Sequence, residues 1–219
     1  KNFDRQINYL NSYELFIKYY QRYLARRLLN NLGKDISCEE EVLLMIKKNL
    51  GQYNIYQLEN MIADIKHSKM TFEKNSKINC YILKSNIWPL KGDCSIKLPE
   101  YLCRYIRSFE EEYQEKYSGR KLTWNHSVSN GILETSYLNK KYIFMVSTEQ
   151  MALLLLFNNY IELNRNKILK LLEIDEEKFD KISKSLLEIK LLLKKDDNYI
   201  LNMNYKSNSL KKNLICKVN

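Results

Sequence analysis

Three segments near the start of the chain carry apolar side chains at intervals of three or four residues, which is the spacing of one face of an α-helix. The stripes consist of Phe16, Tyr20, Leu24 and Leu28, of Leu43, Ile46 and Leu50, and of Leu58, Met61, Ile62 and Ile65. Polar pairs with capping spacing precede them: Asn11 with Glu14, Ser37 with Glu40, and Asn54 with Gln57. Residues 1–77 are therefore predicted to form part of an antiparallel helical bundle, with Gly51 ending its second helix at a positive φ.

The pattern changes near Ile78. The stretch CYILKSNIWP is short and rich in β-forming residues and ends at Pro89, which predicts a strand followed by a turn. The next stretch predicts a fourth helix, with Pro99 at its first position and Gly119 at its end. Its apolar stripe is Leu102, Tyr105, Ile106, Phe109 and Tyr113. The segment SGRKLTW then connects this helix to the strand-like sequence that follows.

The stretch GILETSYLNKKYIFMVS predicts a β-hairpin, because β-forming residues alternate along two arms on either side of a turn. Leu133, Thr135 and Tyr137 alternate on one arm, and Ile143 and Met145 on the other. Asn139 is expected to adopt a positive φ at the turn. Together with the preceding helix, residues 78–147 are predicted to form a small α/β sheet domain.

Residues 148–201 follow the order of a winged helix, which is three helices and then a hairpin. Ser147 with Gln150, Asn164 and Asp175 are the expected helix caps, and two β-runs flank the Asp196–Asp197 pair. Residues 202–219 form a C-terminal segment that could return as a strand. The whole chain is therefore predicted to have an α+β fold.

The formal charge of +10 indicates an acidic partner, either a nucleic acid, a membrane surface or an acidic protein segment, although a solvated basic surface explains it equally well. Arg22, Arg26 and Arg27 are expected to face solvent in part, or else to pair with carboxylates among residues 39–41. No apolar run approaches the roughly 20 residues needed to span a bilayer. Because the chain begins without Met, we expect it to be a fragment.

Few residues suit catalysis or metal binding. The cysteines form no Cys-x-x-Cys pair, so neither a disulfide framework nor a zinc site is expected, and no cofactor is predicted. They are Cys38, Cys80, Cys94, Cys103 and Cys216. Asp64 and His67 have helical spacing, but a solvated or hydrogen-bonded pair is favoured over a ligand pair. Glu110–Glu112 is expected to be solvated, and Trp88 and Trp124 to anchor the core. An enzyme is therefore not predicted.

A winged helix can bind DNA through its third helix and wing. Here that helix mixes acidic residues with lysines, and the wing adds Asp196 and Asp197 after Lys194 and Lys195. Such a mixed surface suits a phosphate backbone poorly. Protein interaction is therefore favoured over nucleic-acid binding.

The order and spacing of YYQRYLARRLL, LENMIADIKHSK, NIWP, KLPEYL, YSGRKLTW and VSTEQMALLLLFN resemble the C-terminal cullin homology region of cullins. The signature residues are Gly119, Arg120, Lys121, Leu122 and Trp124. The resemblance implies a non-catalytic scaffold of a ubiquitin ligase complex in the cytoplasm and nucleus. Its implied partners are a zinc-containing RING-box protein, the ubiquitin-conjugating enzyme that this protein recruits, and a substrate-receptor adaptor held by a stalk absent here.

In the family, a strand of the RING protein joins the cullin sheet, and main-chain hydrogen bonds give the affinity. The candidate residues for that sheet are Ile82, Leu83, Leu133, Thr135, Tyr137, Ile143 and Met145. Strand residues of this kind more often simply pack a core, so the sheet is a firmer prediction than any one contact.

The sequence departs from the family pattern in three respects. The stalk is missing, the segment from Lys74 to Trp88 is shorter than usual, and the sequence stops at LICKVN before the final winged helix, which carries the modifier-accepting lysine. A close alternative is the cullin-like subunit of the anaphase-promoting complex. A winged-helix nucleic-acid-binding protein is an alternative that only the charge supports.

Overall fold

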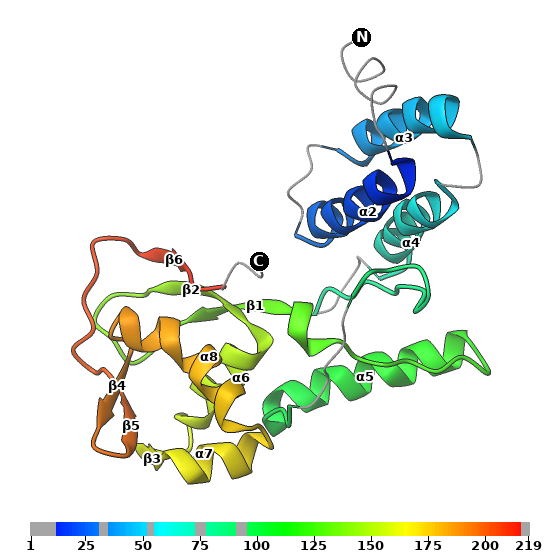
Figure 1. Cartoon of the computed structure of the whole chain (residues 1–219). Helices are drawn as coiled ribbons and strands as arrows, with labels where there is room; N and C mark the ends of the chain where they lie inside the picture. The colour runs from blue at the N-terminus through cyan, green and yellow to red at the C-terminus, as the bar shows by residue number, and fades with distance from the viewer. Residues whose placement is uncertain (1–11, 31–34, 52–54, 73–77, 91–95, 216–219) are drawn as a thin grey trace. The chain divides into compact units, whose positions relative to one another are not determined.

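The computed structural model describes residues 12–30, 35–51, 55–72, 78–90 and 96–215 (Figure 1). Contacts within the chain divide it into two compact units, Lys1–Lys91 and Gly92–Asn219, and each is described by itself. The first unit is helical. The second combines helices with two small sheets, as the predicted α+β class requires.

The first unit contains α2 (Tyr13–Leu29), α3 (Ile36–Leu50) and α4 (Tyr56–Phe72), and α2 and α3 each pack against α4. The predicted stripes meet in one buried cluster, which confirms the helical periodicity. Its fully or almost fully buried members are Leu24, Leu28, Leu43, Ile46, Leu58, Met61, Ile62 and Ile65.

Two helix starts differ from the predicted caps. The N-cap of α2 is Ser12, whose hydroxyl accepts a hydrogen bond from the backbone N–H of Leu15. The N-cap of α3 is Asp35, so Ser37 lies inside the helix and its hydroxyl donates to the Asp35 carboxylate at 2.9 Å. Two of the proposed cap residues, Asn11 and Asn54, lie outside the described residues. Gly51 has the expected positive φ, at +81°.

The predicted strand near Ile78 is wrong. Residues 78–84 run along α4 without pairing to a strand, and the predicted turn follows at residues 85–87. Apolar side chains of the segment join the helical core. Ser68 accepts the N–H of Ile82 at 2.8 Å, and Asp64 accepts the N–H of Lys84 at 3.0 Å. Side chains of a helix thus satisfy backbone groups that a sheet would otherwise bind. By their contacts, residues 78–90 therefore group with the helical unit, which ends at Lys91.

The described part of the second unit begins with residues 96–99. A hydrogen bond of 2.8 Å from the N–H of Lys97 to the carbonyl of Leu172 holds this segment in place. Helix α5 (Glu100–Lys116) follows, with Pro99 as its N-cap and not its first residue. Only Phe109 and Tyr113 of the predicted stripe are buried, and the rest is half-buried. Residues 117–125 lead from α5 into the short 3-10 helix η2 (His126–Val128).

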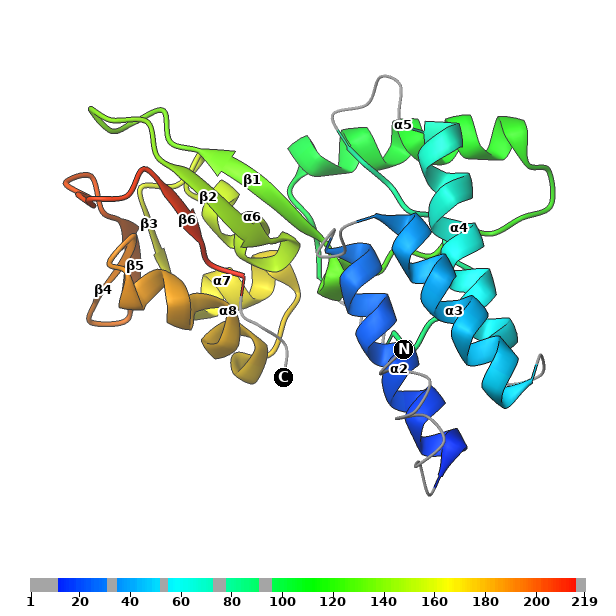
Figure 2. The ribbon, with the colours of Figure 1, turned by 90° about the horizontal axis from the view of Figure 1, so that it is seen from above.

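The remaining elements form two small sheets and three helices (Figures 1 and 2). One sheet is mixed and the other is antiparallel. The elements are β1 (Asn130–Glu134), β2 (Ile143–Ser147), α6 (Thr148–Leu156), β3 (Glu162–Asn164), α7 (Arg165–Leu172), α8 (Glu176–Glu188), β4 (Leu192–Lys195), β5 (Asn198–Leu201) and β6 (Lys211–Asn213). Sheet A has the order β1-β2-β6, with β6 parallel to β2, and sheet B has the order β3-β5-β4.

The winged-helix order is present, and its caps were predicted correctly. Ser147 and Gln150 form a full capping box on α6, and Asn164 and Asp175 cap α7 and α8. Strand β3 was not predicted. One apolar cluster includes residues of both sheets and of all three helices. The predicted α/β domain (78–147) and the predicted winged helix (148–201) therefore share this core.

The β1–β2 connection differs from the predicted hairpin turn. Residues 135–142 form a longer loop, and the described non-glycine residues with positive φ do not include Asn139. Thr135 closes the loop instead: its N–H donates to the carbonyl of Tyr142, and its hydroxyl accepts the N–H of Tyr142, each at 3.0 Å. The connection is therefore closed by the hydrogen bonds of a buried threonine, and not by a positive φ at Asn139.

Candidate partner-binding sheet

Sheet A has a buried inner face. Leu133 and Phe144 stand opposite each other in the β1–β2 ladder, and Val146 is fully buried beside them. Helix α6 covers this face, and a Cβ on Gly131 would lie 1.9 Å from the Met151 methyl carbon. The glycine in β1 thus lets α6 approach the strand closely.

The outer face of the same strands is apolar and open. Ile132 stands opposite Met145, and their exposed fractions are 67% and 42%. Ile143 lies on this face too and is half-buried. Two large apolar side chains that are paired across strands and remain accessible suit contact with a partner better than isolated ones do.

The outer edge of β1 carries backbone groups without a neighbouring strand. In an antiparallel ladder, hydrogen-bonded pairs alternate with non-bonded pairs. The bonds that join Thr135 to Tyr142 and Thr148 to Ser129 fix this alternation. The N–H and C=O groups of Asn130, Ile132 and Glu134 therefore point away from β2. Within the ranges that the structure covers, sheet A continues no further on this side.

The opposite edge, at β6, is less accessible. Strand β6 is three residues long, and the Ser209 hydroxyl already donates to the outward carbonyl of Lys211 at 2.7 Å. Lys211 and Asn213 are both exposed. Short length and charge are features that discourage pairing at a sheet edge. The open edge of β1 is therefore the better place for an added strand.

The signature residues hold the return from α5. Gly119 adopts a φ of +81°, and the guanidinium of Arg120 lies 4.6 Å from the centre of the Tyr117 ring. The indole N–H of Trp124 donates to Glu110 of α5 at 2.7 Å, and its ring meets Phe109 edge-on at 5.6 Å. Leu122 is half-buried and Lys121 is exposed. This segment thus fixes the chain entering sheet A, and Trp124 is an anchor.

The structure brings together only part of the predicted sheet residues. Leu133, Ile143 and Met145 lie on strands of sheet A, but Leu133 faces the core while the other two face outward. Thr135 and Tyr137 lie in the loop, where partial burial raises the pKa of Tyr137 to about 12. Ile82 and Leu83 lie in the first unit and in no sheet.

Sequence reasoning missed Ile132, the most exposed apolar side chain of sheet A. The stretch GILE offers two adjacent apolar residues, and either could face outward. Only the pairing register with β2 decides between them. The free backbone groups of β1 likewise left no signal in the sequence.

Other candidate sites have structural roles. Asp64 is buried and also accepts the indole N–H of Trp88 at 2.9 Å, so it holds the 78–90 segment. Among the residues described, no cluster of three His, Cys, Asp or Glu side chains could hold a metal ion. No helix in the described ranges combines the length and apolar character needed to cross a membrane.

The charges on α8 are partly paired. Arg165 contacts Glu176 and Asp180 at 3.3 and 3.0 Å, and Lys181 contacts Glu177 at 2.6 Å. Lysines and acidic side chains are thus both exposed on α8, as Lys181 and Glu177 are. That this mixed surface suits a phosphate backbone poorly stays a prediction.

Comparison with known proteins agrees with this architecture. Residues 82–215 match the family model described as the Cullin alpha+beta domain, and residues 6–71 match the Cullin alpha solenoid domain. The second match relates residues 6–71 to a helical solenoid of the family. The sequence resemblance had instead implied that the family's stalk is missing from this chain.

Curated relatives cover most of the chain. Cullin-1 of Caenorhabditis elegans is 30% identical over 200 residues, which is 86% of this chain and 26% of the relative. Cullin-1 of Oryza sativa subsp. japonica is 27% identical over 91% of this chain and 29% of the relative. Cullin-1 of Schizosaccharomyces pombe is 27% identical over 91% of this chain and 28% of the relative. The chain thus spans about a quarter of the length of these relatives, and it belongs to the cullin family.

Proposed function

We propose that this chain is the partner-binding part of a cullin scaffold in a ubiquitin ligase, where sheet A receives a strand of a zinc-containing RING-box protein. The RING protein then recruits the ubiquitin-conjugating enzyme, and a substrate-receptor adaptor binds elsewhere on the longer protein. The complex acts in the cytoplasm and nucleus.

The observation that carries this proposal is the open edge of β1. The groups of Asn130, Ile132 and Glu134 that point away from β2 offer hydrogen bonds to a partner strand along its length. Ile132 and Met145 offer apolar contact beside that edge. Helix α6 and the Trp124 anchor hold the edge in place before any partner arrives, which reduces the entropy cost of binding.

A scaffold role needs no reactive group from this chain. A transferring cysteine works as a thiolate, and such residues have a lowered pKa. Burial instead raises the pKa of Cys80 to about 11, which disfavours its thiolate. Cys38 lies exposed on α3, and Cys103 donates to the carbonyl of Leu98 at 3.4 Å. Cys94 and Cys216 lie outside the described residues.

The test is co-expression with a RING-box protein and capture of the complex. Ile132→Pro removes an N–H that points to the open edge, so the hydrogen bonds between β1 and β2 remain. Proline is tolerated at such positions of an edge strand. We expect this variant to lose the RING protein while it retains its thermal unfolding transition. Ile132→Ala keeps the N–H and should bind more weakly than the parent but better than Ile132→Pro.

Leu133→Pro is the matched comparison, because the N–H of Leu133 points toward β2. This variant should disrupt the hairpin itself and lower the unfolding temperature. If folded Ile132→Pro captures the RING protein as well as the parent does, strand addition at β1 is wrong. If the parent chain captures no RING protein, the proposed function is wrong.

A further inference from the structure

The open edge of β1 has the geometry to pair with a copy of itself. Its outward backbone groups belong to Asn130, Ile132 and Glu134, which are spaced evenly on either side of Ile132. If two such strands lie antiparallel around a two-fold axis at Ile132, every outward residue stands opposite another outward residue. Ile132 then faces Ile132 of the second copy, and Asn130 faces Glu134. Each of these pairs can exchange both of its hydrogen bonds, so the whole edge is satisfied.

The side chains along this edge also suit a second copy. Ile132 is 67% exposed and stands opposite Met145 within sheet A. In the paired arrangement it would also contact Ile132 of the second copy, so an apolar row would run across both sheets. The only charged residue of β1, Glu134, would face the uncharged Asn130, and no like charges would stand opposite each other. The edge is therefore complementary to itself in hydrogen bonding, apolar contact and charge.

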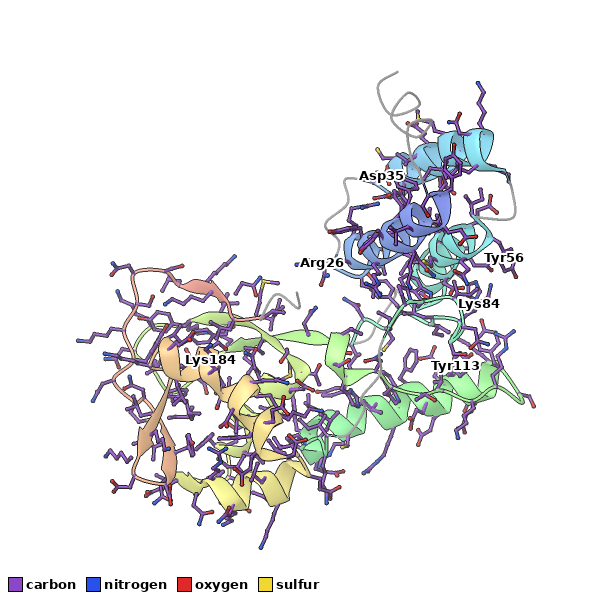
Figure 3. All side chains as sticks on the ribbon, in the orientation of Figure 1. Arg26, Asp35, Tyr56, Lys84, Tyr113 and Lys184 are labelled. Atoms are coloured by element: carbon purple, nitrogen blue, oxygen red, sulfur yellow. The ribbon has the colours of Figure 1, made fainter. Side chains whose placement is uncertain are left out.

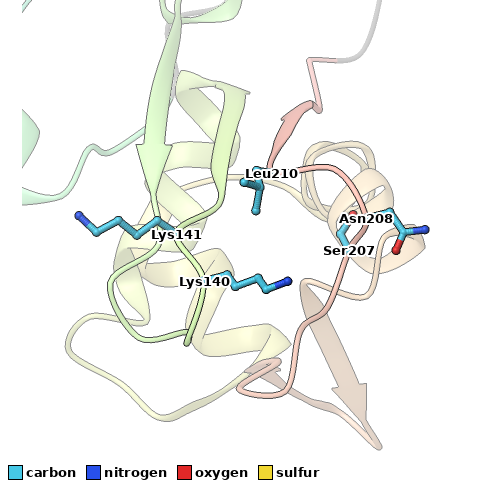
Figure 4. A pocket seen from close by; sticks show the side chains of 5 residues that line it. All are labelled: Lys140, Lys141, Ser207, Asn208 and Leu210. Atoms are coloured by element: carbon cyan, nitrogen blue, oxygen red, sulfur yellow. The ribbon is translucent and has the colours of Figure 1, made fainter.

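Strand β1 lacks the features that commonly prevent pairing at a sheet edge. It contains neither proline nor lysine, and its ladder with β2 runs through five residues without a bulge. Its acidic residue, Glu134, is paired with Lys141 at 3.0 Å. Figure 4 shows Lys141 pointing away from the segment with Ser207 and Asn208. This ion pair offsets part of the charge at the end of the strand, so little remains there to oppose a second copy.

We propose that β1, when its edge is free, pairs with β1 of a second copy of this chain and joins two copies of sheet A into one continuous sheet. The interface is short, so the dimer should be weak, with a Kd on the order of 100 µM, and the free chain is a monomer when dilute. A strand of a RING-box protein would use the same hydrogen bonds, so the two partners exclude each other. The inference shares its edge with the proposed function but does not require it.

The test is sedimentation equilibrium of the full chain over a wide range of concentrations. Ile132→Pro removes the central N–H of both copies and should abolish the dimer. Asn130→Glu would place a second carboxylate opposite Glu134 at both ends of the interface, whereas Asn130→Lys would place an ammonium group there. The first should raise the Kd of the dimer about fivefold, and the second should lower it about fivefold.

Net charge alone predicts the opposite order. The chain has a formal charge of +10, so general repulsion between copies should fall with Asn130→Glu and rise with Asn130→Lys. Asn159→Glu and Asn159→Lys make the same changes of charge at an exposed residue after α6. These controls should change the Kd less than about twofold, in the order that net charge predicts. If the Asn130 variants follow the Asn159 variants, self-pairing of β1 is wrong.

Two further results would overturn the inference: a parent chain that stays monomeric throughout the range, and a dimer that Ile132→Pro leaves unchanged. Addition of a RING-box protein separates the inference from the proposed function. Dissociation of the dimer into one-to-one complexes supports both. A dimer that responds to the Asn130 variants as expected, with a RING-box protein that does not bind at all, supports self-pairing and contradicts the proposed function. A RING-box protein that binds while the dimer persists would overturn self-pairing at β1.

Discussion

The indole N–H of Trp124 donates a hydrogen bond of 2.7 Å to the carboxylate of Glu110, fourteen positions earlier on α5. This bond fastens the GRKLTW segment to the helix that precedes it. Trp124 also lies parallel to the His126 ring at 6.4 Å, and His126 begins the short helix that leads into β1. The bond to Glu110 and the contact with His126 therefore connect the GRKLTW segment to the start of β1. We propose that this strand receives a partner.

Removing the acceptor should loosen this junction. Glu110→Ala should lower the free energy of unfolding by about 1 kcal/mol, because it leaves a half-buried indole N–H without its partner. Urea unfolding monitored by tryptophan fluorescence measures the change. Glu111→Ala alters the exposed neighbour on the same helix and should have almost no effect. Equal effects of the two variants would mean that the bond to Trp124 contributes nothing specific.

Asp64 should matter more to stability than its position in a helix suggests. Asp64→Ala removes the acceptor of two donors, the N–H of Lys84 and the indole N–H of Trp88, and should cost about 3 kcal/mol. Asp64→Asn keeps one acceptor oxygen and should cost less. Chemical denaturation of the two variants tests this order, with Glu41→Ala on the exposed face of α3 as the control. An Asp64→Ala variant as stable as that control would contradict the account.

The ion pair between α2 and α3 should give a pH-dependent stability. Two of the three guanidinium nitrogens of Arg27, Nε and Nη2, donate to the Glu39 carboxylate at 2.6 and 2.8 Å. Hydrogen bonding to Arg27 lowers the pKa of Glu39 below its ordinary value of 4.5, although burial opposes this shift. The folded state therefore favours the ionised carboxylate, and this stabilisation is present above pH 4.5 and is lost as the pH falls through the lowered pKa.

Arg27→Ala should consequently be less stable than the parent at neutral pH by about 1 to 2 kcal/mol, and the difference should shrink in acid. Unfolding free energies measured between neutral pH and pH 3 check this expectation. A difference that stays constant, or grows in acid, would mean that the Arg27–Glu39 pair is not its cause.

Two of the three arginines on α2 are available to a partner. Arg22 and Arg26 are exposed, and Figure 3 labels Arg26 on this helix, whereas Arg27 is paired with Glu39. If the basic surface steers an acidic segment of the conjugating enzyme, charge reversal at Arg22 and Arg26 should slow ubiquitin-chain formation at low salt. The effect should fade at high salt, because the Debye length falls from about 10 Å at 0.1 M to about 3 Å at 1 M.

The control for this reversal is the pair Lys170→Glu and Lys184→Glu, which makes the same change of net charge on exposed residues of α7 and α8. Rates of ubiquitin-chain formation with the RING protein and conjugating enzyme provide the readout. A loss that is the same fraction at every salt concentration, in a folded variant, would exclude steering by these residues.

Features with local causes could be predicted from the sequence. The helices follow from apolar spacing, and the caps at Ser147, Asn164 and Asp175 follow from side chains that accept from the amide three residues later. The wing also depends on a local turn, in which Asp196 has a φ of +53°.

Features that depend on distant residues could not be predicted. Residues 78–90 look like a strand, but Asp64 and Ser68 of α4 satisfy their backbone instead. The outward position of Ile132 follows from its register with Met145, and one step of register would have placed Leu133 there. Strand β3 has only three residues, too few for a periodic pattern.

The most direct measurement is amide hydrogen exchange of β1 in the free chain and in its complex with a RING-box protein. The N–H groups of Asn130, Ile132 and Glu134 point to the open edge, while those of Gly131 and Leu133 already bond to β2. Strand addition predicts that exchange slows strongly at the first three residues on binding, with little change at the other two. A stable complex in which Asn130, Ile132 and Glu134 exchange as fast as in the free chain would contradict the account.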